Sequence, residues 1–414
     1  MKKSLILGLL LSTLCQADLL SLQTCLDKAL ETHPDVKAWL LKVHQERQNV
    51  KSAKGDWLPQ ISVSAEYDPQ RTYVMPQMGR FHTVDDDGWT AGISLKQKVY
   101  DFSKTSYRIE SSKLHKKIAE LSYEEAKALM RYRVRNAYAL VLVQKEALTS
   151  RQKDLEAKQA LYEQAKALVR QGLKTRADES RFLSSVKQAE DALALATAAY
   201  EKARITLEQL IGEKLGPDTD FDTALLTRSP AAAAPALDSV LRSNLSLKIA
   251  RQNVDVSEAT YRSVEAEHFG SVDVIADASH FETLSNYDTT LLGVRYAVPL
   301  YTGGKLTAQA QRSKIASMVA RQNAESRRRA VVQETESLMA DLDEAKKRIE
   351  AREAQLEAAR ETKELIEARY KEGLSTYMEV LDAEAIWLDA RLGLLGARYT
   401  LLEKHYRLEY LNAQ

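Results

Sequence analysis

The sequence is poor in the residues that interrupt helices. Its 414 residues include only 15 Gly and 8 Pro, and two stretches, 93–171 and 305–372, contain neither. Ala, Leu, Glu, Lys, Arg and Gln fill most of the remaining positions, which is the composition of long helices. At about 1.5 Å per residue, a helix over 105–170 would extend for roughly 100 Å. The scarcity of Gly and Pro therefore predicts long helices rather than an ordinary compact domain.

The chain also lacks an excess of charge of either sign. It has 59 basic and 58 acidic residues, for a net charge of +1, and no basic run alternates with aromatic residues, so we expect no nucleic-acid partner. The seven His are scattered without the spacing of metal ligands, and no nucleophile, base and orienting residue form a recognisable set. The sequence therefore predicts no enzyme activity, no cofactor and no metal.

Cysteine is almost absent, and both cysteines lie near the N-terminus. A lysine pair, a short apolar run and a small residue at Ala17 predict a secretory signal peptide over 1–17. A lipoprotein acylated at Cys15 is the alternative, although the bulky Leu14 before the cysteine fits that modification poorly. If Cys15 is removed with the signal, Cys25 is the only thiol and cannot form an internal disulfide or a thiolate metal site.

Long apolar runs are missing from the rest of the chain. The longest lies at about 137–143, far short of the roughly 20 residues of a membrane-spanning helix. The protein is therefore predicted to be exported, and either soluble in the periplasm or held in a membrane by β-strands.

What the chain does contain is an internal duplication. At an offset of 201 residues, Tyr100 corresponds to Tyr301 and Gly172 to Gly373, with no gap between them. Apolar residues in the first copy follow the seven-residue spacing of coiled coils, and the same register recurs in the second copy. The positions are Val141, Leu148, Leu155, Tyr162 and Val169, then Leu342, Ile349, Leu356 and Tyr370, with Lys363 as the one polar exception.

Each copy also contains two stretches in which apolar and polar residues alternate. Strands are predicted at about 60–68 and 89–99, joined by a loop over 68–87, and at about 271–281 and 290–300. Strands of roughly 10 residues suit a tilted transmembrane β-segment, whereas a lone soluble hairpin, the alternative, is barely stable. Aromatic residues at strand ends or within strands would form interfacial belts or pack inside the sheet. They are Trp57, Tyr67, Trp89 and Tyr296.

These features divide the chain into a signal peptide at 1–17, a first repeat at 18–212, a linker at 213–236 and a second repeat at 237–414. Each repeat is expected to contain a helix, two strands, a long helix, a turn and a further helix. The predicted fold class is mainly α with membrane β. Four strands cannot close a barrel and an open edge cannot lie in lipid, so closure requires oligomerisation, and three copies would supply twelve strands.

A family resemblance rests on three features taken together. They are the duplication, the motif LYTGG at 300–304, and the repeated turns, above all ARYKEGLSTYMEVLDA at 368–383. Together they resemble the TolC family of outer-membrane efflux proteins over about 19–411. The resemblance implies a homotrimer with a twelve-stranded β-barrel in the outer-membrane lipid of a Gram-negative bacterium and a long coiled-coil α-helical barrel in the periplasm.

The resemblance also implies a function and partners. The chain would be the exit duct of a tripartite efflux or type I secretion system. Its closed periplasmic tip would open when an inner-membrane pump, of the RND, ABC or MFS type, docks together with a periplasmic adaptor protein. The two turns, at Gly172-Leu173 and Gly373-Leu374, would lie at that tip.

Gate residues follow from the same resemblance. Tyr370 and Asp382 match gate residues of the family's second repeat, and Asp178 matches the acidic partner in the first. The arginine that the family has after the second turn is Ser375 here, and Arg176 is the candidate substitute.

The residues around the turns also support two interpretations that do not depend on the resemblance. Glu379 and Asp382 lie three apart on one helix face, so in a trimer they would form acidic rings that favour cations. However, Thr175-x-x-Asp178 and Thr376-x-x-Glu379 both follow the capping-box pattern, so these carboxylates would cap helices instead of, or besides, gating. Gly172 and Gly373 are interpreted as left-handed turn residues.

Glycine pairs and their equivalents are expected where each second strand meets its long helix. Gly303 and Gly304 are interpreted as the bend from strand to helix, and Phe102 and Ser103 occupy the equivalent positions in the first repeat. The second hypothesis for function is a soluble periplasmic coiled-coil adaptor or scaffold. An adaptor would be expected to carry compact all-β modules, which the sequence does not predict.

Overall fold

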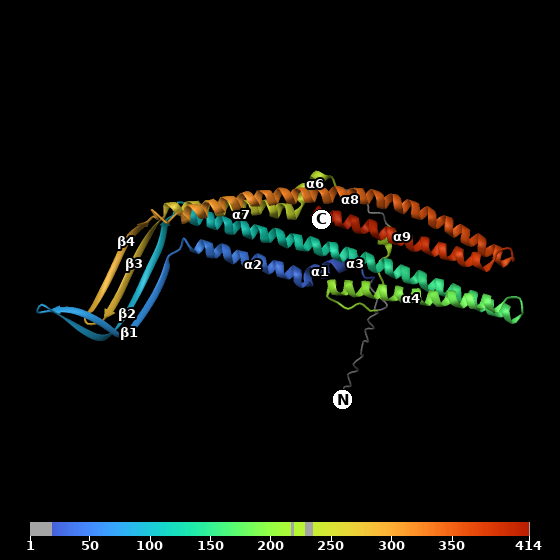
Figure 1. Ribbon diagram of the computed structural model, residues 1–414, viewed down its shortest axis with the longest axis horizontal. Helices are drawn as coiled ribbons and strands as arrows, with labels where there is room; N and C mark the ends of the chain where they lie inside the picture. The colour runs from blue at the N-terminus through green and yellow to red at the C-terminus, as the bar shows by residue number, and fades with distance from the viewer. Residues whose placement is uncertain (1–18, 217–218, 228–234, 414) are drawn as a thin grey trace, which may run out of the picture. The chain divides into compact units, whose positions relative to one another are not determined.

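The computed structural model describes residues 19–216, 219–227 and 235–413. The predicted signal peptide and Cys15 lie outside the described residues. Helices dominate the chain, and four strands form one sheet (Figure 1). Ala38–Glu125 and Asn244–Val331 form one compact unit, here called the sheet unit, and the other described residues form a second, called the turn unit.

The two longest helices have 67 residues each. Both ends of α8 lie 201 positions after the corresponding ends of α3, which is the offset found in the sequence. Neither contains the Gly or Pro that would end or kink it. The helices are α1 (Leu22–Thr32), α2 (Pro34–Gly55), α3 (Lys104–Arg170), α4 (Arg176–Ile211), α5 (Ala224–Thr227), α6 (Leu237–Ser243), α7 (Leu245–Glu265), the 3-10 helix η1 (Ala266–Phe269), α8 (Lys305–Lys371) and α9 (Tyr377–Leu411).

None of the helices in the described part of the chain has the length and apolar content needed to cross a membrane.

The sheet is antiparallel, with the strand order β1-β2-β3-β4. β1 (Gln60–Gln77) and β2 (Arg80–Tyr100) form a hairpin that reaches beyond the hairpin of β3 (Ser271–Glu282) and β4 (Asn286–Ala297) (Figure 1). Among the described residues, β1 and β4 are the edges of the sheet, so each has one side without a strand partner.

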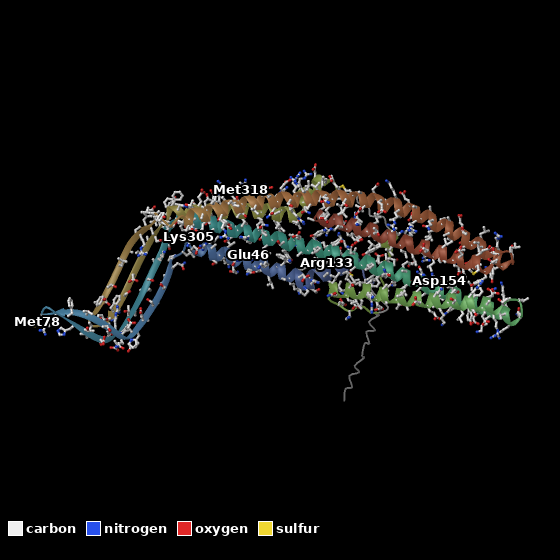
Figure 2. All side chains as sticks on the ribbon, viewed as in Figure 1. Glu46, Met78, Arg133, Asp154, Lys305 and Met318 are labelled. Carbon is white, nitrogen blue, oxygen red and sulfur yellow. The ribbon has the colours of Figure 1, made fainter. Side chains whose placement is uncertain are left out.

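The predicted loop over 68–87 was wrong, because most of this segment belongs to the first hairpin. The ladder continues past a register shift between Asp68 and Arg71, where Pro69 lies in the unpaired interval, and it closes at a two-residue turn. In that turn Met78 has φ 47° and Gly79 has φ 79°; positive φ at both positions is typical of a type I′ hairpin turn. Met78 is labelled at the end of this hairpin in Figure 2. Proline, glycine and three aspartates here mark a bulge and a tight turn, not a long loop.

The second hairpin differs from its prediction mainly in β4. β4 begins at Asn286 and ends at Ala297, whereas 290–300 was predicted. It ends early because Pro299 has no N–H to donate to a ladder. Gly303 and Gly304 then precede α8 with φ 62° and 79°, and Phe102 and Ser103 adopt the same left-handed backbone before α3, with φ 52° and 71°.

The sheet has one mainly apolar face, here called the apolar face, and one mainly polar face. Successive side chains of a strand point to opposite faces, and the register places Val63 opposite Ile93 and Ala276 opposite Leu292. Val63 and Leu292 are each 78% exposed, so this face is not a packed core. On the other face, the hydroxyls of Ser62 and Ser94 lie 2.7 Å apart.

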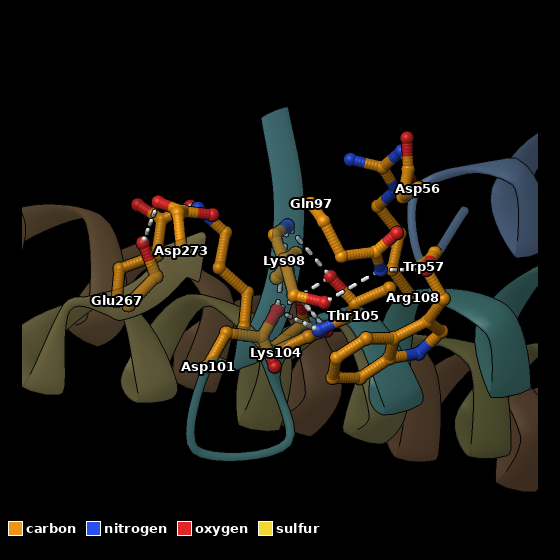
Figure 3. A network of polar contacts seen from close by, with 12 residues as sticks. Asp56, Trp57, Gln97, Lys98, Asp101, Lys104, Thr105, Arg108, Glu267 and Asp273 are labelled. Carbon is orange, nitrogen blue, oxygen red and sulfur yellow. Dashed lines mark hydrogen bonds and ion pairs between the residues drawn. The ribbon is translucent and has the colours of Figure 1, made fainter. Parts of the chain in front are cut away.

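A polar network holds the join between the strands and α3 (Figure 3). The buried Asp101 accepts a hydrogen bond from the Thr105 backbone N–H at 2.9 Å and lies 3.5 Å from the Lys98 ammonium. Lys104 pairs with Glu267 at 2.9 Å. Because Asp101 satisfies amides at the start of α3, the left-handed residues before that helix are held in place despite their Cβ atoms.

In the turn unit, the linker is partly structured. Phe221 is buried and forms a parallel bridge with Leu20, and the Tyr138 hydroxyl donates to the Leu20 carbonyl at 2.8 Å. Cys25 is fully buried in α1, and burial raises the pKa of its thiol to about 11. The thiol is therefore protonated and unreactive at neutral pH.

Candidate functional site

The two helical turns share one backbone geometry. At the end of α3, the Gly172 N–H donates to Val169 and the Leu173 N–H donates to Leu168, at 3.0 and 2.9 Å. At the end of α8, Gly373 and Leu374 donate to Tyr370 and Arg369 in the same way, at 3.0 and 2.8 Å. Both glycines have φ 75°, so each turn is a Schellman motif with glycine in the left-handed position.

Both predicted capping boxes are present in the structure. Thr175 and Asp178 exchange hydrogen bonds at the start of α4, and Thr376 and Glu379 do so at the start of α9. The Thr175 backbone N–H and hydroxyl, at 3.1 and 2.8 Å, lower the pKa of Asp178. The Thr376 backbone N–H, at 2.8 Å, does the same for Glu379. Both carboxylates therefore act as helix caps within the protomer.

An aromatic cluster lies directly behind the turns. The rings of Phe182, from α4, and Tyr377, from α9, are 3.8 Å apart between centroids, and both are buried with Ala165 of α3. Tyr370 and three other partly buried side chains pack against this cluster, and burial raises the pKa of the Tyr370 hydroxyl. The others are Leu161, Tyr162 and Leu381. The cluster thus joins the helices of the first turn to those of the second.

The structure brings some of the predicted gate residues together. The Asp178 carboxylate is close enough to Tyr370 to raise the pKa of its hydroxyl, although no hydrogen bond joins the two within the described ranges. Lys174 and Arg181 are the cations that lower the pKa of Asp178. Arg176 is exposed and is not among them, and Asp382 is exposed on α9.

A buried charged cluster, which the sequence did not suggest, lies further along the same helices. The Glu384 carboxylate of α9 is 7% exposed and 4.0 Å from the Lys363 ammonium of α8, and one of its oxygens has no hydrogen-bond partner among the described residues. Asp154 of α3, labelled in Figure 2, pairs with Lys158 at 3.1 Å. Burial raises the pKa of Glu384, the two lysines lower it, and Glu367 and Asp154 raise it.

Replacing Glu384 by Gln is expected to stabilise the protein at neutral pH. Because the folded state raises the pKa of this carboxyl, the folded protein is most stable below the unfolded pKa of about 4.3 and loses stability as the pH rises towards the folded value. Glu384→Gln should therefore raise the melting temperature at about pH 7.5 and leave it unchanged near pH 4.

Glu379→Gln, on the same helix, is the matched control with the opposite sign. The pKa of Glu379 is lowered, so its contribution is present above the unfolded pKa and is lost as the pH falls. This variant should melt at a lower temperature than the wild type at about pH 7.5. Equal shifts in melting temperature in the two variants would contradict the conclusion that the folded state raises the pKa of Glu384.

The cluster behind the turns also contains residues that the sequence did not single out. Phe182 and Tyr377 come from different repeats and from positions that are not equivalent, so the duplication does not reveal them as a pair. Tyr377 directly follows a capping threonine and is the first residue of α9, and Phe182 lies four positions after Asp178, in the second turn of α4. An aromatic residue within the first two turns of each helix is the signal that would have found them.

Comparison with known proteins decides the family. The sequence model of the family described as "Outer membrane efflux protein" matches residues 25–213 and 236–412. The chain belongs to this family. The match covers most of both repeats and leaves out the linker between them except for its first and last residues.

Relatives of known name support the same assignment. The chain is 24% identical to outer membrane protein TolC of Salmonella enteritidis, over 99% of this chain and 86% of that protein. It is 24% identical to outer membrane efflux protein BepC of Brucella suis, over 95% of this chain and 85% of that protein. These are outer membrane and efflux proteins rather than enzymes.

A solved structure shows that the fold is shared. The open state of the MtrE outer membrane channel of Neisseria gonorrhoeae matches with a TM-score of 0.82 at 19% identity, over 95% of this chain and 88% of that one. The helices and the four-stranded sheet of this protein therefore have the architecture of an outer membrane channel protomer.

Proposed function

We propose that the protein is the outer-membrane exit duct of a tripartite efflux or type I secretion system. It would carry substrates delivered by an inner-membrane pump across the periplasm and the outer membrane. The observation that carries the proposal is the exposed apolar face of the sheet. Val63, Leu292 and Val294 are 72–78% exposed there, which is unfavourable in water and favourable against lipid.

The length of this face suits a membrane. Tyr67 and Trp89 are paired at one end, and Tyr100 and Tyr296 lie at the other, each opposite Val272 of β3. Eleven positions separate Trp89 from Tyr100, so at about 3.3 Å per residue and a tilt of about 40° they span roughly 28 Å, close to the apolar band of about 25 Å in outer-membrane barrels. These aromatic residues would form the two interfacial belts.

The free edges of the sheet favour a homotrimer. Within the part of the chain that the structure describes, β1 and β4 each have one side without a strand partner, and unpaired backbone groups are costly in lipid. Pairing β4 of one protomer with β1 of the next would remove both edges. Three protomers would then close a barrel of twelve strands, with the turn unit in the periplasm.

The turns supply a docking site and a gate in this proposal. Leu173 and Leu374 are 68% and 64% exposed at the two turns, so each turn presents an apolar side chain to a periplasmic adaptor. Tyr370 and Asp178 would hold the closed tip, and Glu379 and Asp382 would line it with negative charge. Arg176 is available for a contact between protomers.

The combination of Tyr370→Phe and Asp178→Ala is expected to raise the ion conductance of the purified channel. It removes the Tyr370 hydroxyl and the carboxylate beside it, which we propose to hold the tip closed. Single-channel recording in planar bilayers measures the effect. Thr376→Val is the control, because it removes the threonine of the other capping box without touching this pair or the acidic residues of the proposed lining. A conductance like that of the wild type in the first variant would refute the gate assignment.

Planar-bilayer recording of the detergent-purified mature protein tests the function itself. We expect discrete conductance steps with a preference for cations, because the proposed tip lining is acidic. A protein that stays soluble without detergent and does not insert would instead favour the periplasmic adaptor or scaffold.

A further inference from the structure

A cavity opens in the sheet unit where α3, α7 and α8 meet the strands. Its volume is about 650 Å³. Phe102, Phe269 and Met318 contribute apolar surface, and Arg262, Lys314 and Arg321 contribute cations. Met318, labelled in Figure 2, and Phe269 are both more than half exposed. The cavity therefore combines an accessible apolar side with a cationic side.

An aromatic path connects this cavity to the apolar face of the sheet. Tyr100 lies on that face, opposite Val272, and its ring is 4.9 Å from that of Phe102. Phe102 is in turn 5.4 Å from Phe269. The Tyr296 hydroxyl, from the same face, donates to the Phe269 carbonyl at 3.2 Å. These aromatic contacts link the apolar face to the cavity.

The charge of the cavity is positive. Arg262 and Arg321 both bind the Glu258 carboxylate, at 2.9 and 3.2 Å, and together they lower its pKa. Glu265 is the second carboxylate in the lining and accepts a hydrogen bond from Tyr261 at 2.8 Å. Lys314 has no ion-pair partner in the part of the chain that the structure describes. The lining therefore contains three cations and two carboxylates. The guanidinium groups of Arg262 and Arg321 lie close together because both bind Glu258.

We infer that this cavity binds a phospholipid of the surrounding membrane, with the lipid phosphate between Lys314 and Arg321. Lys314 and Arg321 lie seven positions apart on one side of α8 and line the cavity beside Arg262, so they can bind a phosphate by charge-assisted hydrogen bonds. The acyl chains would follow the aromatic path onto the apolar face of the sheet. The inference rests on the proposed function, because it requires that face to lie in lipid.

Native mass spectrometry of the detergent-purified protein, titrated with phosphatidylglycerol, tests the site. We expect saturable binding of one lipid per protomer. Lys314→Gln combined with Arg321→Gln should weaken binding about tenfold or more, since it removes two charged contacts. Arg312→Gln, an exposed arginine of α8 outside the cavity, is the matched control and should bind like the wild type.

Two further ligands separate the parts of the lipid. Diacylglycerol with the same chains lacks the phosphate, and inorganic phosphate lacks the chains, so neither should compete effectively with phosphatidylglycerol. Equal binding of diacylglycerol, or equal loss of binding in Arg312→Gln, would overturn the phosphate site.

Bilayer recording distinguishes this inference from the proposed function. The double variant should insert and conduct like the wild type, because the cavity is not part of the proposed conduction path or gate. Insertion of the wild type without saturable lipid binding would overturn the lipid site and leave the channel. Failure of the wild type to insert would overturn both.

Discussion

Leu292→Arg is expected to prevent stable insertion of the protein into the outer membrane, whereas Leu291→Arg is expected to be tolerated. Leu292 lies on the apolar face opposite Ala276, and Leu291 lies on the other face opposite Asp277. Arginine on the lipid face near the middle of the bilayer costs about 2–4 kcal/mol. Three copies in a trimer would raise this to roughly 6–12 kcal/mol.

The comparison is well controlled because the two leucines are neighbours in β4 and undergo the same replacement. Leu291 is 52% exposed and Leu292 is 78% exposed, so a soluble protein would tolerate both changes. The amount of protein in the outer-membrane fraction and the frequency of insertion into planar bilayers measure the effect. Equal accumulation of the two variants would contradict a lipid-facing role for this side of the sheet.

Gly270→Ala is expected to have the second largest effect. Gly270 precedes β3 with φ 74° and ψ −154°, a region of backbone conformation that is essentially restricted to glycine. A Cβ there would lie 2.0 Å from the carbonyl oxygen of Ala297 in β4. Backbone strain alone costs about 1–3 kcal/mol, and the clash requires the paired ends of β3 and β4 to separate as well.

Heat resistance of the purified protein and its yield in the membrane fraction measure this effect, and both should fall. Gly293→Ala is the control, since a Cβ at Gly293 would meet only the Ile275 side chain, at an ordinary distance of 3.9 Å. Wild-type heat resistance in Gly270→Ala would show that the start of β3 tolerates displacement.

The long helices could be predicted because their signal is local. Neither α3 nor α8 contains Gly or Pro, and glycine follows each of them in a left-handed turn, at Gly172 and Gly373. Both capping boxes were likewise predictable, because a threonine and a carboxylate three positions later interact within one turn of a helix.

The extent of the first hairpin was not predictable in the same way. The segment between Asp68 and Asp87 has the proline, glycine and aspartate content of a loop. Its ladder depends on pairing across the turn, for example the hydrogen bond from the Thr72 hydroxyl to Asp85 at 2.6 Å. Such cross-strand contacts decide strand length more than the composition of either strand does.

The candidate site was only partly predictable for a related reason. The sequence placed Tyr370 and Asp178 in their repeats, but it could not show that Phe182 and Tyr377 pack against each other behind the two turns. It also gave no sign that Glu384 is buried near Lys363. Both features depend on which faces of α4, α8 and α9 meet, and a helical period alone does not fix the partner of each face.

The two joins between strand and helix share a backbone conformation but differ in mechanical stiffness. Before α3, Phe102 and Ser103 carry side chains in left-handed conformations, and the buried Asp101 holds the first turn of the helix. Before α8, the equivalent residues are Gly303 and Gly304, which lack a Cβ atom and can adopt a wider range of backbone conformations. We therefore expect any change in the angle between helix and strand to occur at the second join, before α8, rather than at the first join, before α3.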